Sequence, residues 1–398
     1  KWCAVKNETP KIEGGFETRA VRTQMAQTAQ REHSTPLYLT SSFTFDDADM
    51  GAGLFSGELE GNLYSRFSNP NTDEFAAKMA SLEGAESAIA TASGMSAVFT
   101  ALAAHLKSGD HVISARAIFG NSTHILSQIL PQWGIECTFV DARDPLSWAA
   151  AVRPTSKLVF LETPTNPTLD LIDLEWVGDF AKAHGLLYVV DNCFATPYLQ
   201  TPVQFGADLV LHSATKYIDG QGRVLGGVIA GSASAVDVCY GFLRRTGPSL
   251  SAFNAWILSK SLETLAVRMD RHCDNALAFA QFLEGHPAVE RVLYPELPSH
   301  PQHHLFQKQM RRGGGMVAVE VRGGLERARD LLNKLQRFSL TANLGDARSI
   351  ATHPASTTHK GTPPDVRRAV GIEDGLLRFS LGLETVEDLM NDFDRAAQ

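Results

Sequence analysis

Short apolar runs alternate with helical stretches from about residue 85 onward, and this alternation constrains the fold more than any other feature. The runs are Ser87–Ala92, His111–Ser114, Cys137–Val140, Leu158–Leu161, Leu186–Val190, Leu209–Leu211 and Leu225–Ala230. A repeated order of strand and helix predicts an α/β fold with a mostly parallel sheet that helices cover on both faces. Ligands bind beyond the carboxyl ends of such strands, so we expect the functional residues to follow the runs.

The regions before and after this sheet have different patterns. Residues 1–64 show little periodicity, and Asp46–Asn62 is crowded with glycine and acidic residues, so we expect residues 1–64 to form an extended arm. Residues 65–260 then form the large domain. A chain of 398 residues exceeds what one core usually holds, which favours a second domain. Helical periodicity across Ser251–Leu283 leads into it.

Residues 261–398 predict a smaller α+β domain. Its expected elements are the strands Val317–Val321 and Leu376–Leu381 and the helix Glu326–Leu335. A closing helix is expected to begin at Thr385, because Asp388 stands at the spacing of a capping box.

Composition and charge exclude several classes of function. Hydrophobic residues make up 44% and charged residues 20%, the balance of a folded globular protein. The net charge is −8, and the sequence has no block of basic residues that could bind the phosphates of a nucleic acid. A small-molecule partner is therefore favoured. The 5 cysteines are scattered and form no Cys-x-x-Cys pair, which argues against a disulfide framework or zinc site and favours a reducing compartment.

Targeting and metal-binding signals are weak. Lys1–Pro10 has no apolar stretch of signal-peptide length, and no later run reaches the roughly 18 apolar residues of a spanning helix, so we expect a cytoplasmic protein without membrane contact. His300, His303 and His304 cluster in a proline-containing stretch without carboxylate or thiolate neighbours. We expect a solvated loop there and no metal site.

Lys216 is the first candidate for chemistry. It ends Ser213-Ala214-Thr215-Lys216, directly after the run Leu209–Leu211, where a lysine can reach a bound ligand and form a Schiff base. Taken alone, the motif also fits an ordinary solvated lysine in a loop.

Asp191 is the second candidate, because it ends an apolar run with a carboxylate. Burying that carboxylate is costly unless a cation meets it, and a protonated pyridine nitrogen would be such a cation. The acid would keep the pyridine ring charged, so that the ring accepts electrons when a bond at a substrate Cα breaks. A helix cap at a strand-to-loop junction is the alternative.

The segment Thr91–Ser96 follows a strand and precedes a helical stretch, with Gly94 at its centre. Free N–H groups and the positive dipole end make the start of a helix a phosphate site, and glycine permits close backbone approach. Ser213 and Thr215 could add hydroxyl donors to the same phosphate. The alternative is an ordinary Ser-Gly turn.

Three more polar residues stand out from their surroundings. Arg66 follows Tyr64 by two positions, and its planar fork of donors suits phosphate, although a surface loop would also explain it. Asn166 lies in the segment Glu162–Pro167, whose prolines restrict the loop, and it could contact a phenolic oxygen on the pyridine ring that Asp191 would face. Arg378 interrupts an apolar strand and could pair with a substrate carboxylate or with a structural one.

The glycine-rich stretch Gly220–Gly227 superficially resembles a dinucleotide-binding loop. Such a loop requires a helix after it, whereas the β-rich Val228-Ile229-Ala230 follows here. We therefore interpret it as a flexible loop beside Lys216.

Taken in order, these motifs resemble the Cys/Met-metabolism family of pyridoxal-phosphate enzymes over nearly the whole chain. The resemblance rests on Tyr64 and Arg66, Ser93-Gly94-Met95, Glu162–Pro167, Asp191, Ser213–Tyr217, His353-Pro354 and Arg378. It implies the type I, aspartate-aminotransferase-like fold, with a mostly parallel seven-stranded sheet and a smaller α+β C-terminal domain. It also implies homotetramers in which Tyr64 and Arg66 of the arm reach the phosphate of a neighbouring subunit.

The resemblance assigns roles to individual residues. Lys216 would be catalytic and would hold the cofactor. The other residues implied to bind the cofactor are Tyr64, Arg66, Gly94, Met95, Phe119, Asn166, Asp191, Ser213 and Thr215. Arg378, Asn343 and Tyr64 would bind the substrate, and no metal is implied.

Departures from the family pattern bear on the reaction. Phe119-Gly120 stands where most members have Tyr-Gly, so the residue that stacks on the cofactor lacks a hydroxyl. Asn121 stands where methionine γ-lyases typically have cysteine, and Asn343 begins a segment where several relatives have Ser-Leu-Gly. Together with Glu32-His33-Ser34 and Asp219–Arg223, Phe119-Gly120 looks most like the sulfhydrylases that use O-succinylhomoserine.

The implied reaction is γ-replacement on an O-acylated homoserine, with sulfide as nucleophile and homocysteine as product. Lys216 would carry the proton transfers with no help from a stacking tyrosine. Cystathionine γ-synthase and methionine γ-lyase are the alternatives within the family. A cofactor-free Schiff-base lyase and a nucleotide-binding module are the alternatives from other classes, but both leave Arg66, Asp191 and Gly94 unexplained.

Overall fold

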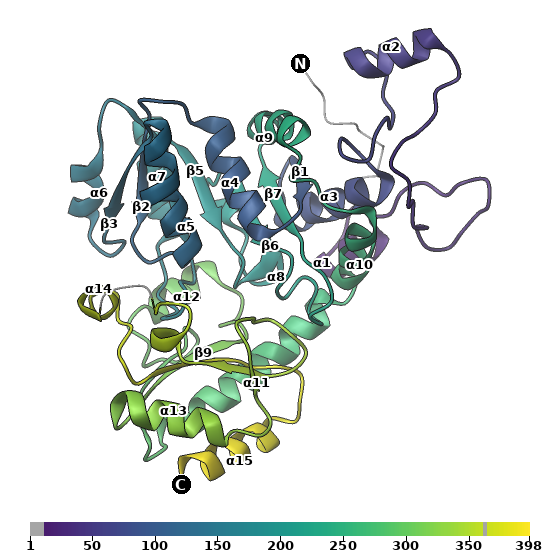
Figure 1. The fold of residues 1–398 in the computed structure, drawn as a ribbon. Coiled ribbons are helices and arrows are strands. Elements are labelled where there is room, and N and C mark those ends of the chain that lie inside the picture. The colour runs from purple at the N-terminus through teal and green to yellow at the C-terminus, as the bar shows by residue number, and fades with distance from the viewer. Residues whose placement is uncertain (1–11, 361–363) are drawn as a thin grey trace.

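The computed structural model describes residues 12–360 and 364–398. Figure 1 shows a large sheet domain, a smaller domain beneath it and an arm that projects from the large domain near the start of the chain. The large sheet has the strand order β1-β7-β6-β5-β4-β2-β3. Its strands are β1 (Ser87–Thr91), β2 (His111–Ala115), β3 (Glu136–Val140), β4 (Ser156–Glu162), β5 (Leu187–Asp191), β6 (Leu209–Ser213) and β7 (Gly227–Gly231).

The predicted mostly parallel sheet of seven strands is confirmed. Strands β2 to β6 run parallel, and only β7 is antiparallel to both of its neighbours, β6 and β1. The carboxyl ends of β4, β5 and β6 consequently meet along one edge, which we call the carboxyl edge. This edge faces the small domain.

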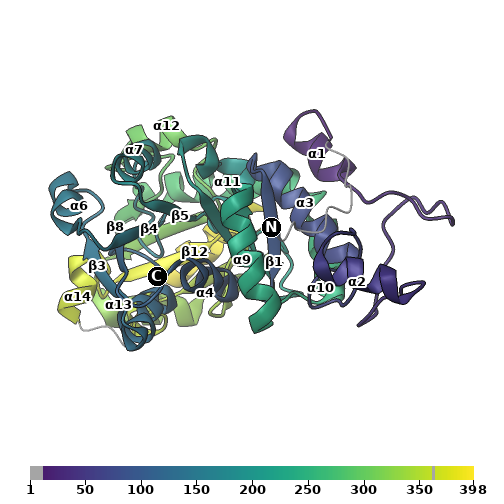
Figure 2. The same ribbon diagram turned by 90° about the horizontal axis from the view of Figure 1, so that it is seen from above.

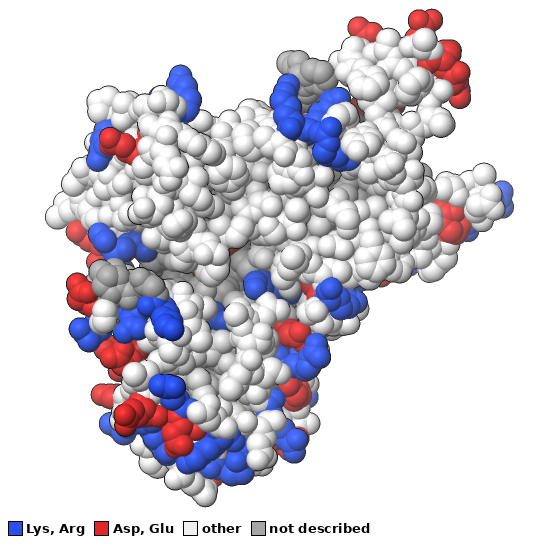
Figure 3. Space-filling view, viewed as in Figure 1, with Lys and Arg blue, Asp and Glu red and all other residues white. Residues whose placement is uncertain are grey.

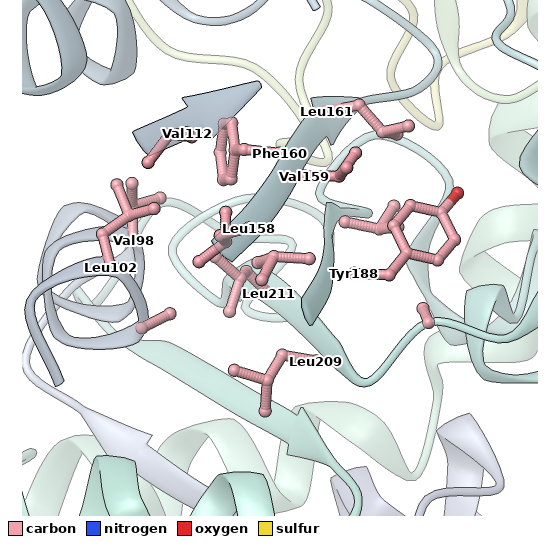
Figure 4. Packing of buried hydrophobic residues seen from close by; sticks show 14 of the residues in the cluster. Val98, Leu102, Val112, Leu158, Val159, Phe160, Leu161, Tyr188, Leu209 and Leu211 are labelled. Carbon is pink, nitrogen blue, oxygen red and sulfur yellow. The ribbon is translucent and has the colours of Figure 1, made fainter. Parts of the chain in front are cut away.

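Helices cover the large sheet on both faces (Figure 1). They are α3 (Pro70–Glu83), α4 (Gly94–His105), α5 (Gly120–His124), α6 (Pro145–Ala151), α7 (Leu174–His184), α8 (Thr196–Leu199), α9 (Ala233–Thr246) and α10 (Ala252–Leu262). A π-helical turn Ile125–Ile129 and 3₁₀ turns at Leu130–Trp133 and Pro202–Phe205 complete the domain. Because strand side chains alternate, Leu158 meets Val98 of α4 on one face while Val159 points to the other, where Tyr188 lies (Figure 4).

The small domain has a mixed sheet of order β10-β11-β12-β9-β8. Its strands are β8 (Val289–Leu293), β9 (Met316–Val321), β10 (Ser339–Leu340), β11 (Ile350–Thr352) and β12 (Leu376–Ser380). Its helices are α11 (Leu265–Glu284), α12 (His303–Gln309), α13 (Gly324–Lys334), α14 (Pro364–Ala369) and α15 (Val386–Ala397), with a 3₁₀ turn at Pro354–Ser356. A buried cluster that includes Tyr217, Leu262 and Met316 joins the two domains.

The expected arm contains helices that its sequence pattern did not indicate. Two helices, α1 (Phe16–Arg22) and α2 (Ala48–Ser56), lie in the first 64 residues, and α2 occupies the glycine-rich stretch. The glycines serve packing: a Cβ on Gly51 would lie 2.9 Å from the Phe45 ring, and one on Gly53 would lie 2.7 Å from Leu59. Asp47 caps α2 by accepting a hydrogen bond from the Met50 N–H at 2.7 Å.

Side chains of α3 fix the base of the arm to the large domain. Glu74 accepts hydrogen bonds from the Met25 N–H, at 3.1 Å, and from the Thr35 hydroxyl. Asn71 binds the backbone of Pro36 and Tyr38, each at 2.8 Å. Beyond this base the arm leaves the body of the molecule on one side, as the view from above shows (Figure 2).

The closing helix α15 begins after Thr385, as expected, but the capping box is absent: the Thr385 side chain makes no capping hydrogen bond, and the Asp388 N–H bonds to the Thr385 carbonyl. The expectation of a solvated histidine loop was wrong for His300. His300 is buried, not solvated, and His303 begins α12. Within the described residues, no group of three His, Cys, Asp or Glu side chains could hold a metal ion.

Candidate active site

Lys216 lies just beyond the carboxyl end of β6, in the turn that follows Ser213. Its Nζ donates a hydrogen bond to Asn343 Oδ1 at 2.7 Å. Asn343 belongs to the small domain, in the loop between β10 and β11, so the lysine amine lies between the two domains. Burial lowers the pKa of Lys216, and the nearby Arg378 guanidinium lowers it further.

Two carboxylates stand side by side at the carboxyl edge. Asp191 at the end of β5 is in register with Glu162 at the end of β4. Burial raises the pKa of Asp191 to about 6 and raises the pKa of Glu162 well above its usual value, to which repulsion from Asp191 adds. Asp191 accepts a hydrogen bond from the Cys193 N–H at 3.1 Å, and neither carboxylate has an ion-pair partner among the described residues. A pair like this calls for a cation from outside the chain.

The start of α4 lies against the end of β6. Ser93 caps the helix, because its Oγ accepts from the Ser96 N–H at 3.1 Å. A Cβ on Gly94 would lie 2.5 Å from the Ser213 Cβ, a distance that real Cβ atoms essentially never show. Glycine at position 94 therefore allows the helix start and the strand end to converge. The next residue, Met95, is half-buried and packs against the core of the large domain.

The hydroxyl of Thr215 lies in the same turn as Lys216 but is already occupied. It donates to the Gly226 carbonyl at 3.3 Å and accepts from the Gly226 N–H at 3.2 Å. The glycine-rich stretch after it leads into β7 and not into a helix, so it lacks the geometry of a dinucleotide-binding loop.

Arg378 on β12 is 3% exposed and has no carboxylate partner among the described residues. Its guanidinium donates to Asn166 Oδ1 at 2.8 Å and to the Asn343 carbonyl at 3.2 Å, while its buried Nε has no partner. Burial lowers the pKa of Arg378 to about 10. A buried guanidinium with an unused donor is a ready site for a carboxylate.

Phe119 and Asn166 lie in the loops that follow the carboxyl ends of β2 and β4. The Phe119 N–H donates to Glu162 Oε2 at 2.6 Å. The amide oxygen of Asn166 is occupied by Arg378, which leaves its NH₂ group as the donor for another oxygen.

Tyr64 and Arg66 are not brought to this site within one chain. Arg66 donates to the Arg244 carbonyl and lies over the Phe67 ring, 4.7 Å from its centroid. Tyr64 is exposed, and the structure gives neither side chain a hydrogen bond or ion pair with Lys216. Hydrogen bonds between the carboxyl edge and β12 join four other predicted residues: Asn166, Lys216, Asn343 and Arg378.

Glu162 is a residue of the site to which its sequence motif, Glu162–Pro167, assigned no role. Glu162 ends a strand just as Asp191 does, so the same reasoning about a buried carboxylate could have found it. Its hydrogen-bond partners are backbone N–H groups, which leave no signal in a sequence.

Pyridoxal phosphate suits the residues gathered here. The buried Asp191 lacks the cation that a protonated pyridine nitrogen would supply, and Lys216 offers a half-buried amine with a lowered pKa. The helix start at Gly94 would hold the phosphate, and the free donor of Arg378 would hold an amino-acid carboxylate. The fold and site together define a pyridoxal-phosphate enzyme of the type I fold.

Comparison with known proteins gives the family. Residues 17–398 match the model of the family described as Cys/Met metabolism PLP-dependent enzyme, and the chain belongs to this family. The chain is 44% identical over 394 residues to the O-succinylhomoserine sulfhydrylase of Pseudomonas aeruginosa, which covers 99% of this chain and 98% of the relative. It is 43% identical over 384 residues to the L-methionine gamma-lyase of Porphyromonas gingivalis, with 96% of each chain covered.

A solved structure supports the same fold and cofactor. The putative O-acetylhomoserine (thiol)-lyase of Campylobacter jejuni superposes with a TM-score of 0.93 at 34% identity, covering 96% of this chain and 100% of that one. That structure contains N'-pyridoxyl-lysine-5'-monophosphate, a lysine joined to the cofactor. The chain is therefore a pyridoxal-phosphate enzyme of trans-sulfuration, which acts on sulfur-related amino acids. No helix within the described residues has the length and apolar character that crossing a membrane requires.

Proposed function

We propose that the chain catalyses γ-replacement on O-succinylhomoserine, with sulfide as nucleophile and homocysteine and succinate as products. The observation that carries the proposal is the buried guanidinium of Arg378, which has no carboxylate partner within residues 12–360 and 364–398. It contacts Asn343, the residue that accepts the hydrogen bond of Lys216. An amino-acid carboxylate bound there would bring the substrate Cα near the lysine amine.

Lys216, Asp191 and Arg378 have different roles in this reaction. When bound, pyridoxal phosphate withdraws electrons from the substrate Cα, which weakens the C–H bond there. Lys216 Nζ takes that proton, and the lowered pKa of the lysine makes the neutral amine available as a base. Asp191 balances the positive charge of the pyridine ring, and Arg378 fixes the orientation of the carboxylate. Loss of a Cβ proton then supplies the electron pair that expels succinate as the Cγ–O bond breaks. Hydrosulfide forms the Cγ–S bond, and the protons taken from Cβ and Cα are returned to give homocysteine.

Two features favour the sulfhydrylase over other members of the family. The relatives at 44% identity from Pseudomonas aeruginosa and Mycobacterium tuberculosis are O-succinylhomoserine sulfhydrylases. Asn121 stands where methionine γ-lyases typically have cysteine. Methionine γ-lyase remains the second candidate, because a relative with that activity is 43% identical over nearly the same length.

Product analysis separates these reactions. Purified protein is incubated with O-succinylhomoserine or O-acetylhomoserine, in each case with sulfide, with cysteine or without a nucleophile. A separate incubation contains methionine alone. The proposal predicts homocysteine and succinate from O-succinylhomoserine and sulfide, with little keto acid when sulfide is omitted. Rapid release of 2-oxobutanoate from methionine would identify a γ-lyase, and cystathionine as the main product with cysteine would identify a γ-synthase.

We also propose that the chain works as a homotetramer of active dimers, with Tyr64 and Arg66 reaching the neighbouring subunit's phosphate. Figure 3 shows that the large-domain face turned to the viewer carries few charged side chains, whereas the small domain is covered with them. Apolar side chains are exposed along the arm and on α10 and α11: Leu39, Phe45, Phe55, Leu59, Phe253 and Val267. Charge-poor surface with exposed apolar side chains is typical of subunit interfaces.

A further inference from the structure

Glu162 is a buried acid that the proposed chemistry does not use. Its side chain is at the end of β4, and the residue is only 5% exposed. A carboxyl group is costly to bury without a cation, and Glu162 has no ion-pair partner among the described residues. Other contacts of Glu162 must therefore offset the cost of burying its carboxyl group.

Those contacts are with residues that surround the cofactor site. Glu162 Oε2 accepts the backbone N–H of Phe119 at 2.6 Å. The backbone N–H of Asn166 is near enough to the carboxyl group to lower its pKa, against the larger effect of burial. Glu162 stands in register with Asp191 on the neighbouring strand. Glu162 thus contacts Phe119, the residue implied to stack on the cofactor ring, and lies near Asn166, which is implied to bind the phenolic oxygen of the ring. It also lies beside Asp191, which is implied to bind the ring nitrogen.

We propose that Glu162 is a positioning residue, whose carboxyl group holds the backbone of Phe119 and Asn166 so that the cofactor ring is fixed in one orientation between Lys216 and Asp191. This inference rests on the proposed cofactor site. It does not depend on which trans-sulfuration reaction the chain catalyses.

The length of the side chain carries this role. The hydrogen bond from the Phe119 N–H to Glu162 is 2.6 Å long. The side chain of aspartate is one methylene shorter, so its carboxyl group cannot form this bond unless β4 moves. Charge is less important, because burial and the neighbouring Asp191 raise the pKa of Glu162 and favour its neutral form. Glutamine has the same reach and imitates that neutral form.

Three substitutions of Glu162 separate the effect of side-chain length from the effect of the acid group. Glu162→Gln keeps the length and one acceptor, Glu162→Asp keeps the acid but not the reach, and Glu162→Met keeps the volume without an acceptor. Each variant is prepared without cofactor and titrated with pyridoxal phosphate, and the visible circular dichroism of the bound cofactor is recorded. This dichroism reports the orientation of the ring in its chiral surroundings.

The Asp and Met variants should bind cofactor about tenfold more weakly, the effect of losing a hydrogen bond to an acid, and their dichroism should fall. The Gln variant should retain most of both. For turnover, the kcat of the Asp variant should fall more than its KM for the amino acid rises, because Arg378 still holds the carboxylate. The Asp variant keeps a carboxyl group at position 162, so the comparison of the Gln and Asp variants stands even where the Met variant does not fold.

Asp110 provides a matched control, because it is a buried acid beside a strand of the same sheet that also accepts a backbone N–H, from Lys107 at 2.9 Å, but it precedes β2 and so lies away from the carboxyl edge. Asp110→Leu should lower the melting temperature without changing the dichroism. Wild-type dichroism in the Asp variant, equal loss in the Gln and Asp variants, or equal loss in the Asp110→Leu variant would each overturn the positioning role. Failure of the wild-type chain to bind pyridoxal phosphate would instead contradict the cofactor site itself.

Discussion

At the scale of single residues, the site depends on groups that are incomplete without a ligand. Among the residues that the structure describes, Arg378 Nε has no hydrogen-bond partner, Asp191 has no ion-pair partner, and the hydrogen bond of Lys216 Nζ goes to the amide oxygen of Asn343. Unsatisfied charges of this kind lower the stability of the empty protein and raise its affinity for the ligand that completes them. Each of these groups can be tested separately.

Arg378→Lys should weaken substrate binding much more than cofactor binding. Lysine keeps the positive charge but loses the planar fork that grips a carboxylate with two hydrogen bonds. We expect the KM for the amino-acid substrate to rise about ten- to hundredfold, the effect of one charge-assisted hydrogen bond. Arg367 is the control, since it is also buried in the small domain but already pairs with Asp374 at 2.8 Å. An equal rise in KM for Arg367→Lys would argue against a specific role for Arg378.

Asp191→Asn should stabilise the cofactor-free protein at alkaline pH. Burial raises the pKa of Asp191 from 3.8 to about 6. The folded protein thus holds this proton more tightly than the unfolded chain does. The stability associated with Asp191 is therefore fully present below about pH 4 and is lost as the pH rises through about 6. At pH 8 the Asn variant should be more stable by on the order of 1 to 3 kcal/mol, with little difference at pH 4.

Urea unfolding at both pH values, with and without pyridoxal phosphate, measures this effect. The cofactor should reverse the order at pH 8, because its ring nitrogen supplies the missing cation to Asp191 and not to asparagine. Asp141→Asn is a control with the opposite expected sign. Hydrogen bonds and the charge of Arg143 lower the pKa of Asp141, so removal of the Asp141 carboxylate should destabilise the protein at pH 8. A wild-type protein that remains more stable than Asp191→Asn without cofactor would refute the argument.

At the scale of elements, the meeting of α4 with β6 decides whether a phosphate can be held. Gly94→Ala would place a Cβ 2.5 Å from the Ser213 Cβ, which forces the helix start away from the strand. We expect the affinity for pyridoxal phosphate to fall about tenfold or more, because the N–H groups of the first turn move out of reach. Gly285→Ala is the control, with nothing within 4 Å of its added Cβ. Unchanged cofactor affinity in Gly94→Ala would remove α4 from the phosphate site.

The elements of the large sheet could be predicted because strands buried on both faces have continuous apolar sequences, as in Leu158–Leu161. Three strands of the small domain could not. β10 and β11 have 2 and 3 residues, too few to show any period. In β8, the exposed Glu290 and Arg291 interrupt the apolar residues. Helix α2 was missed for a different reason, since its glycines fit against Phe45 and Leu59, contacts that no local pattern records.

The candidate site was predictable where a polar residue ends an apolar strand, as Asp191 does, or interrupts one, as Arg378 does. The contact between Lys216 and Asn343 could not be foreseen, because it joins residues 127 positions apart and from different domains. The engagement of the Thr215 hydroxyl with Gly226 was hidden for a similar reason, since its partners are backbone atoms.

At the scale of the whole molecule, the arm is fixed at its base and exposed beyond it. Glu74 and Asn71 hold its first part against α3, whereas apolar residues such as Leu39 and Phe55 face solvent in the single chain. An arm built in this way is suited to contact a second copy of the chain. The position of Arg66 on the Phe67 ring, away from Lys216, agrees with a role in the neighbouring subunit's site.

Mixing inactive subunits tests that role. Lys216→Ala and Arg66→Ala should each reduce activity at least about a hundredfold, because one removes the base and the other a phosphate contact. When the two variants are unfolded together and refolded, half of the dimers are mixed, and each mixed dimer has one site with both an intact lysine and an intact partner arginine. Activity should then recover to about a quarter of the wild-type level. Lys216→Ala mixed with Arg378→Ala should stay inactive, because those residues act within one chain, and equal inactivity of both mixtures would place Arg66 in its own subunit's site.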